Sequence, residues 1–305
     1  MKKPLKFSFI LSISLLFFCC QFRDKLGTQP IFRYEKTISV DGLNRTFTLN
    51  LPPNYYENSN LPLVIALHGG GGSGEQCEKD YNLTEKANAE NFAIVYPDGV
   101  QSDGLLRLRT WNAGTCCDYA LEKNIDDVHF ISVMIDEILK NYKINPKKVY
   151  ATGMSNGAIL SYKLACEIPN KITAIAAVSG PMSLKDECKS TKPIPILHLH
   201  SVLDQKVPVN GGTGIAGNTF PAVTAGLNTW SKLNECKTLA KVIKDDSKYK
   251  LTQWLDCKNN AIITYYLTKD GGHSWPGAVK VRAAADEPST VIKANDLIFD
   301  FFKQF

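Results

Sequence analysis

The sequence predicts an α/β fold with a mostly parallel central sheet, helices on both of its faces and an N-terminal β-hairpin. Short, wholly apolar runs such as residues 63–67 are typical of strands that are covered on both faces. Residues 126–142 instead repeat apolar side chains at steps of three and four, which predicts an amphipathic helix. The two kinds of segment alternate along the 305-residue chain, and this order favours parallel strands joined by crossover helices.

The expected hairpin comprises residues 34–40 and 45–51, which alternate apolar and polar side chains around Asp41-Gly42. Further strands are expected at 63–67, 92–96, 149–152, 172–178 and 194–199, followed by three strand-like pieces that end at 261–267. Further helices are expected at 158–165, 219–233 and 289–302, the last with a serine cap. Residues 100–124 lack a clear period and are expected to form a long surface loop.

Residues 1–20 differ in composition from the rest of the chain. Lys2, Lys3 and Lys6 precede an apolar run over 7–18, as in a secretory signal peptide. We therefore expect a signal at 1–20, a polar linker at 21–30 and one domain over 31–305. The protein would be secreted, periplasmic or on the cell surface. Residues 16–19 also resemble a lipobox, so an alternative is a lipoprotein signal with a lipid on Cys19 or Cys20.

Seven cysteines follow the signal, and an exported chain with this many is expected to form disulfides. Cys236 and Cys257 bracket a lysine-rich segment, and Cys166 and Cys188 bracket one strand unit, so each pair is expected to bridge. Cys77 is expected to pair with either Cys116 or Cys117, which leaves the other of these two as a free thiol.

The net charge of +5 is mild, and no Lys/Arg tract occurs outside the extreme N-terminus. Nucleic-acid binding is therefore not expected. Membrane contact is expected only through an N-terminal lipid anchor. We expect a monomer that needs neither a cofactor nor a metal ion.

The segment Gly153-Met154-Ser155-Asn156-Gly157 lies between a β-rich run and a helix-like run. A serine at such a junction sits on a sharp turn, often with positive φ, and glycines two residues away avoid steric clashes. The N–H groups that open the following helix point toward any negative charge near the serine. Ser155 is therefore a candidate nucleophile, although a Gly-Ser turn that merely joins two elements would look the same.

A serine nucleophile needs a base, and His273 is the candidate. It lies in Gly272-His273-Ser274-Trp275-Pro276-Gly277, an irregular loop after the last core strand. In α/β-hydrolases the serine is followed first by the acid and then by the histidine. His198 and His200 also follow Ser155, but they lie on a strand before the best acid. Alternatively, they form a His-x-His metal pair, for which no third ligand is evident.

Asp204 is the candidate acid, because it follows the apolar strand 194–199 and precedes His273. Its role would be to accept a hydrogen bond from imidazole Nδ1–H and fix the tautomer. Asp186 and Glu187 are alternatives, and Asp204 could also be a simple turn former.

Backbone N–H groups are expected to bind the oxyanion. One should belong to Asn156, directly after the nucleophile, and the other to the glycine run after residue 67, where we choose Gly70. That run lacks the Gly-Lys-Ser/Thr ending of a P-loop, so nucleotide binding is not expected.

At these residues the chain resembles secreted esterases of the polyhydroxybutyrate depolymerase and feruloyl/acetylxylan esterase type, within the α/β-hydrolase superfamily. The matching motifs extend from about residue 34 to the C-terminus; they are Leu67-His68-Gly69-Gly70, Tyr96-Pro97-Asp98-Gly99, Thr110-Trp111-Asn112-Ala113-Gly114, Ile125-Asp126-Asp127-Val128, the Ser155 pentapeptide, Asp204 with Val207-Pro208, and the His273 segment. The resemblance implies a triad of Ser155, Asp204 and His273. It also implies that Trp275 and Trp111 lie near the substrate.

By the same resemblance, the domain over 31–305 would be the catalytic domain of an exported serine carboxylesterase. Ser201 and Val209 depart from the family pattern near the acid, which affects the expected substrate rather than catalysis. The resemblance does not extend to a granule-binding module, so we expect soluble feruloyl, acetyl or short hydroxyalkanoate esters. The alternatives are a polyhydroxybutyrate-type polyester depolymerase, a peptidase, or a non-catalytic binding protein on the same fold.

Overall fold

The computed structural model describes residues 32–281, 283 and 285–305. The expected signal peptide (1–20), the linker (21–30) and the candidate lipid sites Cys19 and Cys20 lie outside these residues. The chain divides into the units Met1–Phe32 and Arg33–Phe305, and the second unit contains all the elements described below.

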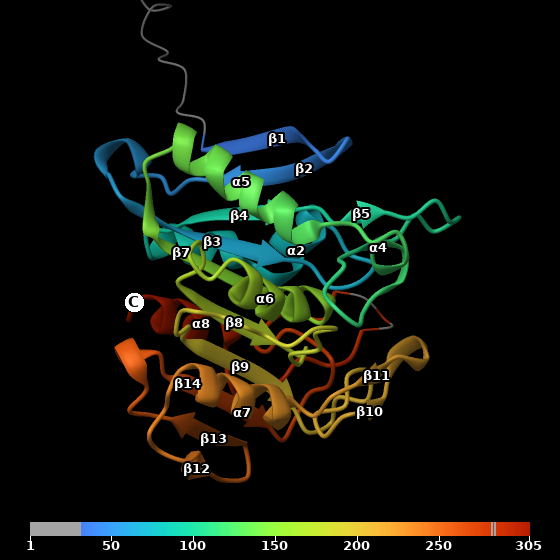
Figure 1. Ribbon diagram of the computed structural model, residues 1–305, viewed down its shortest axis with the longest axis vertical. Helices are drawn as coiled ribbons and strands as arrows, with labels where there is room; N and C mark the ends of the chain where they lie inside the picture. Colours follow the sequence, from blue (N-terminus) through green and yellow to red (C-terminus); the bar gives the residue numbers. More distant parts are fainter. Residues whose placement is uncertain (1–31, 282, 284) are drawn as a thin grey trace, which may run out of the picture. The chain divides into compact units, whose positions relative to one another are not determined.

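A ten-stranded sheet with the order β1-β2-β4-β3-β7-β8-β9-β14-β13-β12 runs through this unit (Figure 1). Its strands are β1 (Arg33–Val40), β2 (Leu43–Asn50), β3 (Leu61–Leu67), β4 (Ala93–Pro97), β7 (Ile144–Met154), β8 (Ala174–Val178), β9 (Ile196–Ser201), β12 (Lys241–Asp245), β13 (Tyr249–Trp254) and β14 (Ile263–Thr268). The strands from β4 to β14 in this order are parallel, while β1–β2 and β13–β12 extend the sheet antiparallel at its two ends. The predicted mostly parallel sheet and N-terminal hairpin are confirmed.

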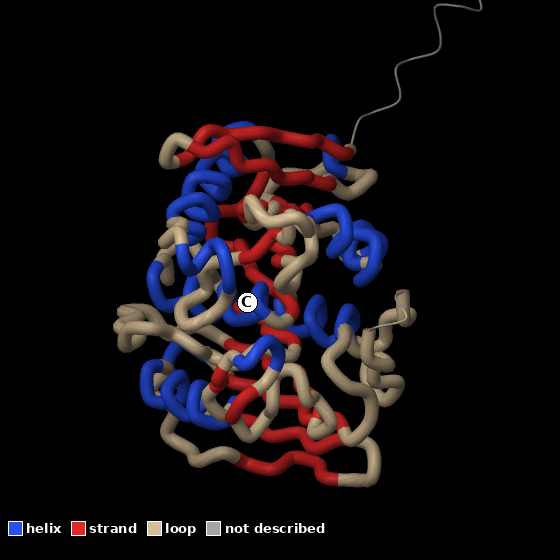
Figure 2. Tube along the Cα trace, turned by 90° about the vertical axis from the view of Figure 1, so that its right-hand side faces the viewer, coloured by secondary structure: helices blue, strands red, loops and turns tan. Residues whose placement is uncertain are grey.

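Helices cover both faces of the sheet (Figures 1 and 2). They are α2 (Gly74–Tyr81), α3 (Leu83–Ala89), α4 (Asp118–Glu122), α5 (Asp127–Asn141), α6 (Asn156–Glu167), α7 (Val223–Leu233) and α8 (Ala294–Phe302). Buried residues of α2, α3 and α8 form one core cluster with the central strands. Helices α5, α6 and α7 lie on the other face. Both faces of the central strands are therefore buried, which explains their continuous apolar runs.

Two helices begin later than the sequence predicts. Helix α8 begins at Ala294, because Ser289 Oγ donates to Asp270 Oδ1 (2.5 Å) and Thr290 N to Asp270 Oδ2 (2.8 Å). The apparent serine cap therefore fixes a loop rather than a helix. Helix α7 begins at Val223, because Thr219–Phe220 (β11) pairs with Gly212–Thr213 (β10).

The region 100–124 contains more regular structure than expected. Val100–Gln101 (β5) pairs with Arg109–Thr110 (β6), and the short helix α4 follows. The hairpin between β5 and β6 carries two strongly exposed apolar side chains, Leu105 (99% exposed) and Leu106 (76%).

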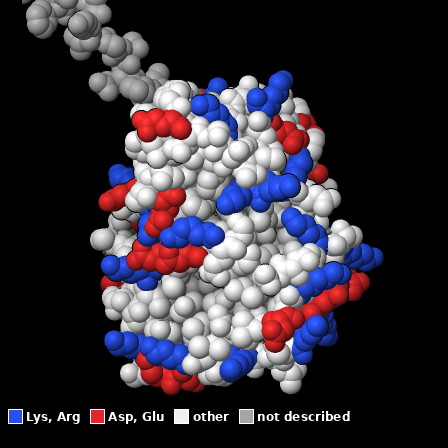
Figure 3. Space-filling model, turned by 90° about the vertical axis from the view of Figure 1, so that its left-hand side faces the viewer, with Lys and Arg blue, Asp and Glu red and all other residues white. Residues whose placement is uncertain are grey.

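Charged side chains of both signs alternate over the face shown in Figure 3, without a continuous basic surface on that face. Among the described residues, no helix combines the length and apolar character needed to cross a bilayer.

The parallel strands bring the candidate residues to one edge of the sheet. Gly70 follows β3, Ser155 follows β7, Asp204 follows β9 and His273 follows β14. Because these four strands point the same way, their carboxyl ends lie at the same edge, where α/β sheets bind ligands.

Candidate active site

Ser155 occupies the sharp turn between β7 and α6. Its φ of 57° and ψ of −120° lie in a region that non-glycine residues rarely adopt. The turn is held by Ser155 N donating to Val178 O (2.9 Å) and Ile159 N donating to Ser155 O (3.0 Å). A Cβ on Gly157 would lie 2.4 Å from Leu67 O, so only glycine fits where the turn packs against the end of β3.

Asp204 and His273 are joined across two loops. His273 Nδ1 lies 2.8 Å from Asp204 Oδ2. The other carboxylate oxygen, Oδ1, accepts hydrogen bonds from Lys206 N (3.0 Å) and Val207 N (2.8 Å). Burial by itself raises the pKa of Asp204, but donors on His200 and His273 outweigh it and hold the pKa below its usual range. Asp204 therefore remains ionised and directs His273 Nδ1–H toward itself.

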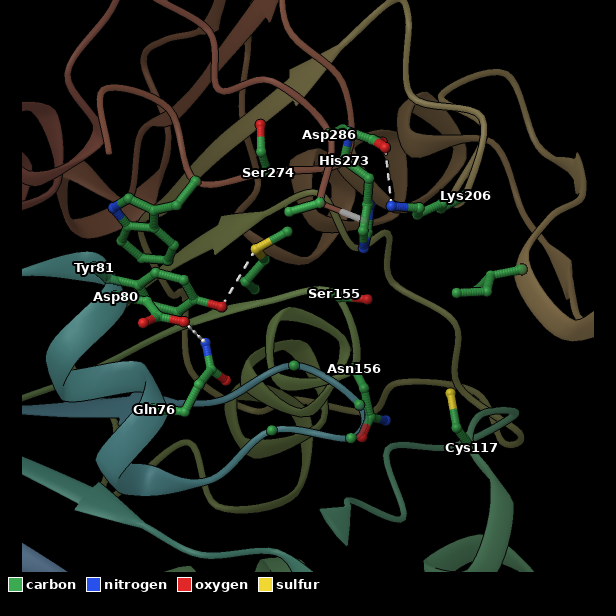
Figure 4. Close-up of a pocket in the computed structure, with 18 of the residues that line it drawn as sticks. Gln76, Asp80, Tyr81, Cys117, Ser155, Asn156, Lys206, His273, Ser274 and Asp286 are labelled. Atoms are coloured by element: carbon green, nitrogen blue, oxygen red, sulfur yellow. Dashed lines mark hydrogen bonds and ion pairs between the residues drawn. The ribbon is translucent and has the colours of Figure 1, made fainter. Parts of the chain in front are cut away.

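Ser155 and His273 line the same cleft, whose volume is about 500 Å³. In Figure 4 the imidazole extends toward Ser155 from the opposite side of the cleft. No hydrogen bond joins the serine to the ring among the described residues. Such bonds commonly tighten only when substrate binds. Asp186 and Glu187, the alternative acids, are exposed in the loop after β8 and do not line this cleft.

The two proposed oxyanion donors lie next to each other. A Cβ built on Gly70 would lie 3.7 Å from Asn156 Cβ, and both residues line the cleft. Neither backbone N–H has an acceptor within the described part of the chain, so both can donate to a ligand. Asn156 is also the first residue of α6, where the helix dipole favours negative charge.

His68 holds the glycine run after β3 in place through its buried ring. Its Nε2 accepts a hydrogen bond from Gly99 N (2.9 Å), so Nδ1 carries the ring proton and donates to Gly69 O (2.8 Å). The ring is completely buried, and this burial lowers the pKa of His68 to about 4. His68 is therefore neutral, with one fixed tautomer, at ordinary pH.

We expect this buried histidine to make folding sensitive to acid. Its pKa of about 4 in the folded state lies below the unfolded value of about 6.5, so the unfolded chain takes up the proton first as pH falls. Full stability is present above pH 6.5 or so, and about 3 kcal/mol is lost by pH 4. Urea unfolding at several pH values should show an acid loss that is smaller in His68→Gln than in the wild type by about this amount. Parallel curves for the two proteins would contradict it.

Trp275 and Trp111 occupy different places. Trp275 lines the cleft, stacks on Tyr81 with ring centroids 4.4 Å apart, and donates from Nε1 to Asn295 Oδ1 (2.8 Å). Trp111 is fully buried and does not line the cleft. Its Nε1 donates to His68 O (2.9 Å), and its backbone N–H donates to Asn156 Oδ1 (2.8 Å). This position does not fit the expected substrate contact, and Trp111 instead supports the backbone of His68 and the side chain of Asn156.

Two further residues at the cleft, Lys206 and Asp286, are part of no motif. Lys206 Nζ donates to Asp286 Oδ1 (2.9 Å), and His273 N donates to Asp286 Oδ2 (2.8 Å) (Figure 4). The ion pair therefore connects the loop that carries Asp204 to the loop that carries His273. Lys206 could have been noticed from its closeness to Asp204, but Asp286 follows His273 by 13 residues in a segment without a pattern.

The cysteine expectations are confirmed in part. Disulfides join Cys166 to Cys188 (S–S 2.06 Å) and Cys236 to Cys257 (2.01 Å). The expected pairing of Cys77 is wrong. Cys116 and Cys117 pair with each other beside the cleft, while Cys77 is a free thiol that packs into the core from α2.

His198 and His200 contact each other rather than forming a metal site. His198 Nε2 lies 3.1 Å from His200 Nδ1. No group of three or more His, Cys, Asp or Glu side chains within the described ranges is arranged to hold a metal ion.

The chain is similar in sequence to a known family and to several curated proteins. A family model described as phospholipase/carboxylesterase matches residues 56–216. Feruloyl esterase B of Piromyces equi is 26% identical over 238 residues, which cover 75% of this chain and 42% of that protein. The bifunctional acetylxylan esterase/xylanase of Neocallimastix patriciarum is 26% identical over 233 residues, or 76% of this chain and 31% of that protein. The chain thus spans less than half the length of these two curated relatives.

Among solved structures, an acetyl xylan esterase from Aspergillus awamori aligns with a TM-score of 0.61 at 15% identity, covering 88% of this chain and 99% of that one. A putative dienelactone hydrolase from Klebsiella pneumoniae aligns with a TM-score of 0.56 at 14% identity, covering 90% and 98%. At such low identity these likenesses concern the fold, which is the expected α/β-hydrolase fold.

Proposed function

Because the chain belongs to this phospholipase/carboxylesterase family, we propose that it is a serine carboxylesterase with Ser155 as nucleophile, His273 as base and Asp204 as the orienting acid. The observation that carries the proposal is the 2.8 Å contact between His273 Nδ1 and Asp204 Oδ2, with Ser155 on a strained turn in the same cleft. The convergence of these three side chains, which are distant in sequence, supports acyl transfer as the reaction.

The reaction would proceed through an acyl-enzyme. Ser155 Oγ attacks the ester carbonyl while its proton passes to His273 Nε2. The carbonyl oxygen becomes negative and accepts hydrogen bonds from the N–H groups of Gly70 and Asn156, each worth about 3 kcal/mol. As the tetrahedral species collapses, the C–O bond to the alcohol breaks and His273 protonates the departing oxygen. Water then repeats the sequence on the acyl-enzyme, releasing the acid and restoring Ser155.

We propose soluble carboxylic esters as substrates, with feruloyl, acetyl or short hydroxyalkanoate acyl groups on small molecules or oligosaccharides. The names of the relatives, feruloyl esterase and acetylxylan esterase, support this class. A cleft of about 500 Å³ with a Tyr81–Trp275 wall also suits an aromatic acyl group or a sugar, since both pack well on aromatic faces.

One observation favours a polyester depolymerase as second candidate. Leu108 and Val279 line the cleft yet are 43% and 80% exposed, and Leu105 and Leu106 protrude from the same hairpin as Leu108. Such an apolar rim could contact an insoluble ester surface. Release of soluble acid from polyhydroxybutyrate particles, compared with release from soluble hydroxybutyrate esters, separates the two candidates.

We also infer that the chain is exported. The two disulfides Cys166–Cys188 and Cys236–Cys257 support an oxidising compartment. Lipid attachment at Cys19 or Cys20 is the finer form of this proposal. Palmitate labelling that disappears in the Cys19→Ser, Cys20→Ser double variant would support it, and unlabelled wild-type protein would exclude it.

A fluorophosphonate probe tests the proposed nucleophile directly. We expect one adduct on the peptide that contains Ser155, together with hydrolysis of p-nitrophenyl acetate well above hydrolysis of peptide anilides. Folded wild-type protein that resists the probe would contradict the proposal. Equal or faster cleavage of anilides would favour a peptidase, and ligand binding without turnover would favour a binding protein.

A further inference from the structure

A chain of buried polar groups lies behind the triad. Tyr162 on α6 and His198 and His200 on β9 are all essentially inaccessible to solvent. His198 and His200 point to the same face of the sheet, because side chains two residues apart on a strand do so. Tyr162 Oη lies 2.8 Å from His198 Nδ1, His198 Nε2 lies 3.1 Å from His200 Nδ1, and His200 Nε2 lies 3.3 Å from Asp204 Oδ2.

The positions of the protons in this hydrogen-bonded series can be derived from the groups at its two ends, Asp204 and Tyr162. His200 Nε2 lies 2.9 Å from Val207 O and 3.3 Å from Asp204 Oδ2. Both oxygens are acceptors, so this nitrogen carries a proton. At the other end, His198 Nδ1 is the one hydrogen-bond partner of the Tyr162 hydroxyl among the described residues, so that hydroxyl must donate to His198 Nδ1.

With both ends fixed, only one neutral arrangement satisfies every group. Tyr162 donates to His198, His198 Nε2–H donates to His200 Nδ1, and His200 Nε2–H faces Val207 O and Asp204. Burial and the neighbouring His200 lower the pKa of His198 well below its usual value, which agrees with a neutral ring. If the order were reversed, the His200 lone pair would face the Asp204 carboxylate, and the two would repel each other.

We propose that Tyr162, His198 and His200 form a directional hydrogen-bond relay that keeps a His200 N–H facing Asp204, so that His200 is a positioning residue for the catalytic acid. This inference rests on the proposed triad. The His200 proton withdraws negative charge from the oxygen that also faces His273, and it prevents the carboxylate from rotating. The other titratable groups that face these residues are Tyr265, beside His198, and Lys206 and Asp286, beside His273.

The relay makes a prediction that differs from that of a merely structural role. In His200→Leu the carboxylate loses a donor, so it stabilises protonated His273 more strongly. The acid limb of the kcat/KM profile should move to higher pH by about half a unit or more. At the pH plateau, kcat should nevertheless fall roughly tenfold, because the carboxylate is then free to rotate and orients His273 less well. His200→Gln keeps an N–H at the Nε2 position and should recover most of both effects.

Tyr162→Phe and Tyr265→Phe form a matched pair of variants that tests the Tyr162 end of the relay. Tyr162→Phe removes the hydroxyl that sets the direction, and it should shift the acid limb in the same direction as His200→Leu. Tyr265→Phe is the control: its ring lies 5.5 Å from that of His198, and no hydrogen bond joins its hydroxyl to the relay. Like Tyr162→Phe, Tyr265→Phe removes a phenolic oxygen from a tyrosine beside His198, but it should leave the pH profile of kcat/KM unchanged.

A second readout does not depend on turnover. Proton NMR of the low-field His273 Nδ1–H resonance should show its pH titration midpoint raised in His200→Leu and Tyr162→Phe and unchanged in Tyr265→Phe. Unshifted midpoints and acid limbs in both relay variants, with wild-type protein labelled at Ser155, would overturn the relay and leave the proposed esterase intact. Wild-type protein that cannot be labelled would overturn both.

Discussion

Ser155→Ala is expected to lower the turnover of ester substrates roughly 10⁵-fold or more, to a rate near that of the oxyanion site alone. No other hydroxyl in the cleft lies on a turn with its φ of 57° at the start of a helix. The proposed oxyanion donors are backbone groups, so they remain when the side chain is truncated. The variant should therefore still bind ester substrates with a Kd close to the wild-type KM.

Ser161→Ala provides the matched control for this experiment. Ser161 is buried on the same helix, and its Oγ donates to Gly157 O (3.0 Å), so its loss tests whether removing any hydroxyl from α6 impairs the fold. Initial rates with p-nitrophenyl acetate, together with thermal unfolding, should show two folded proteins of which only Ser161→Ala is active. An active Ser155→Ala would refute the proposed nucleophile.

Asp204→Asn is expected to lower kcat by about 10⁴-fold, because it would impose the wrong tautomer on His273. The backbone N–H groups of Lys206 and Val207 donate to one carboxylate oxygen, and in the variant they would hold the amide oxygen in that place. The amide nitrogen would then face His273 and donate to its Nδ1. The ring proton would move to Nε2, where His273 can no longer accept a proton from Ser155.

Asp286→Asn is the control that separates the tautomer effect of Asp204→Asn from a general loss of negative charge beside His273. Asp286 accepts the backbone N–H of His273 and not the ring, so its amide leaves the tautomer free. We expect at most about a tenfold loss there, from a weakened ion pair with Lys206. Similar kcat values for the two Asn variants would show that the tautomer is not what Asp204 controls. Rates should be measured on the plateau of each pH profile.

The parts of the site that could be predicted from sequence are those governed by local backbone rules. The Ser155 turn needs glycines at fixed positions, and a Cβ at Gly157 would indeed clash with the end of β3. Asp204 and His273 could be selected because parallel strands bring their carboxyl ends together in a known order. Their roles remain predictions until the variants are measured.

Features that depend on packing between distant segments could not be predicted. A spacing rule cannot show that the side chain of Cys77 turns into the core while Cys116 and Cys117 pair with each other. Trp111 lies in a motif whose resemblance to known esterases implies a place near the substrate, yet its Nε1 donates to the backbone of His68. A metal pair stayed open as an alternative for His198 and His200, because the hydrogen bond between Tyr162 and His198 is visible only in the folded chain.

The outermost strand β12 has a consequence for how the molecule behaves in concentrated solution. All five of its residues are exposed, Lys241 and Lys244 are charged, and the pairing register with β13 shifts between Val242 and Lys244. Charged side chains and an irregular ladder of this kind disfavour the addition of a strand from another copy. The border of the sheet thus resists fibre-like stacking, and substituting both lysines with valine should promote aggregation that light scattering can detect.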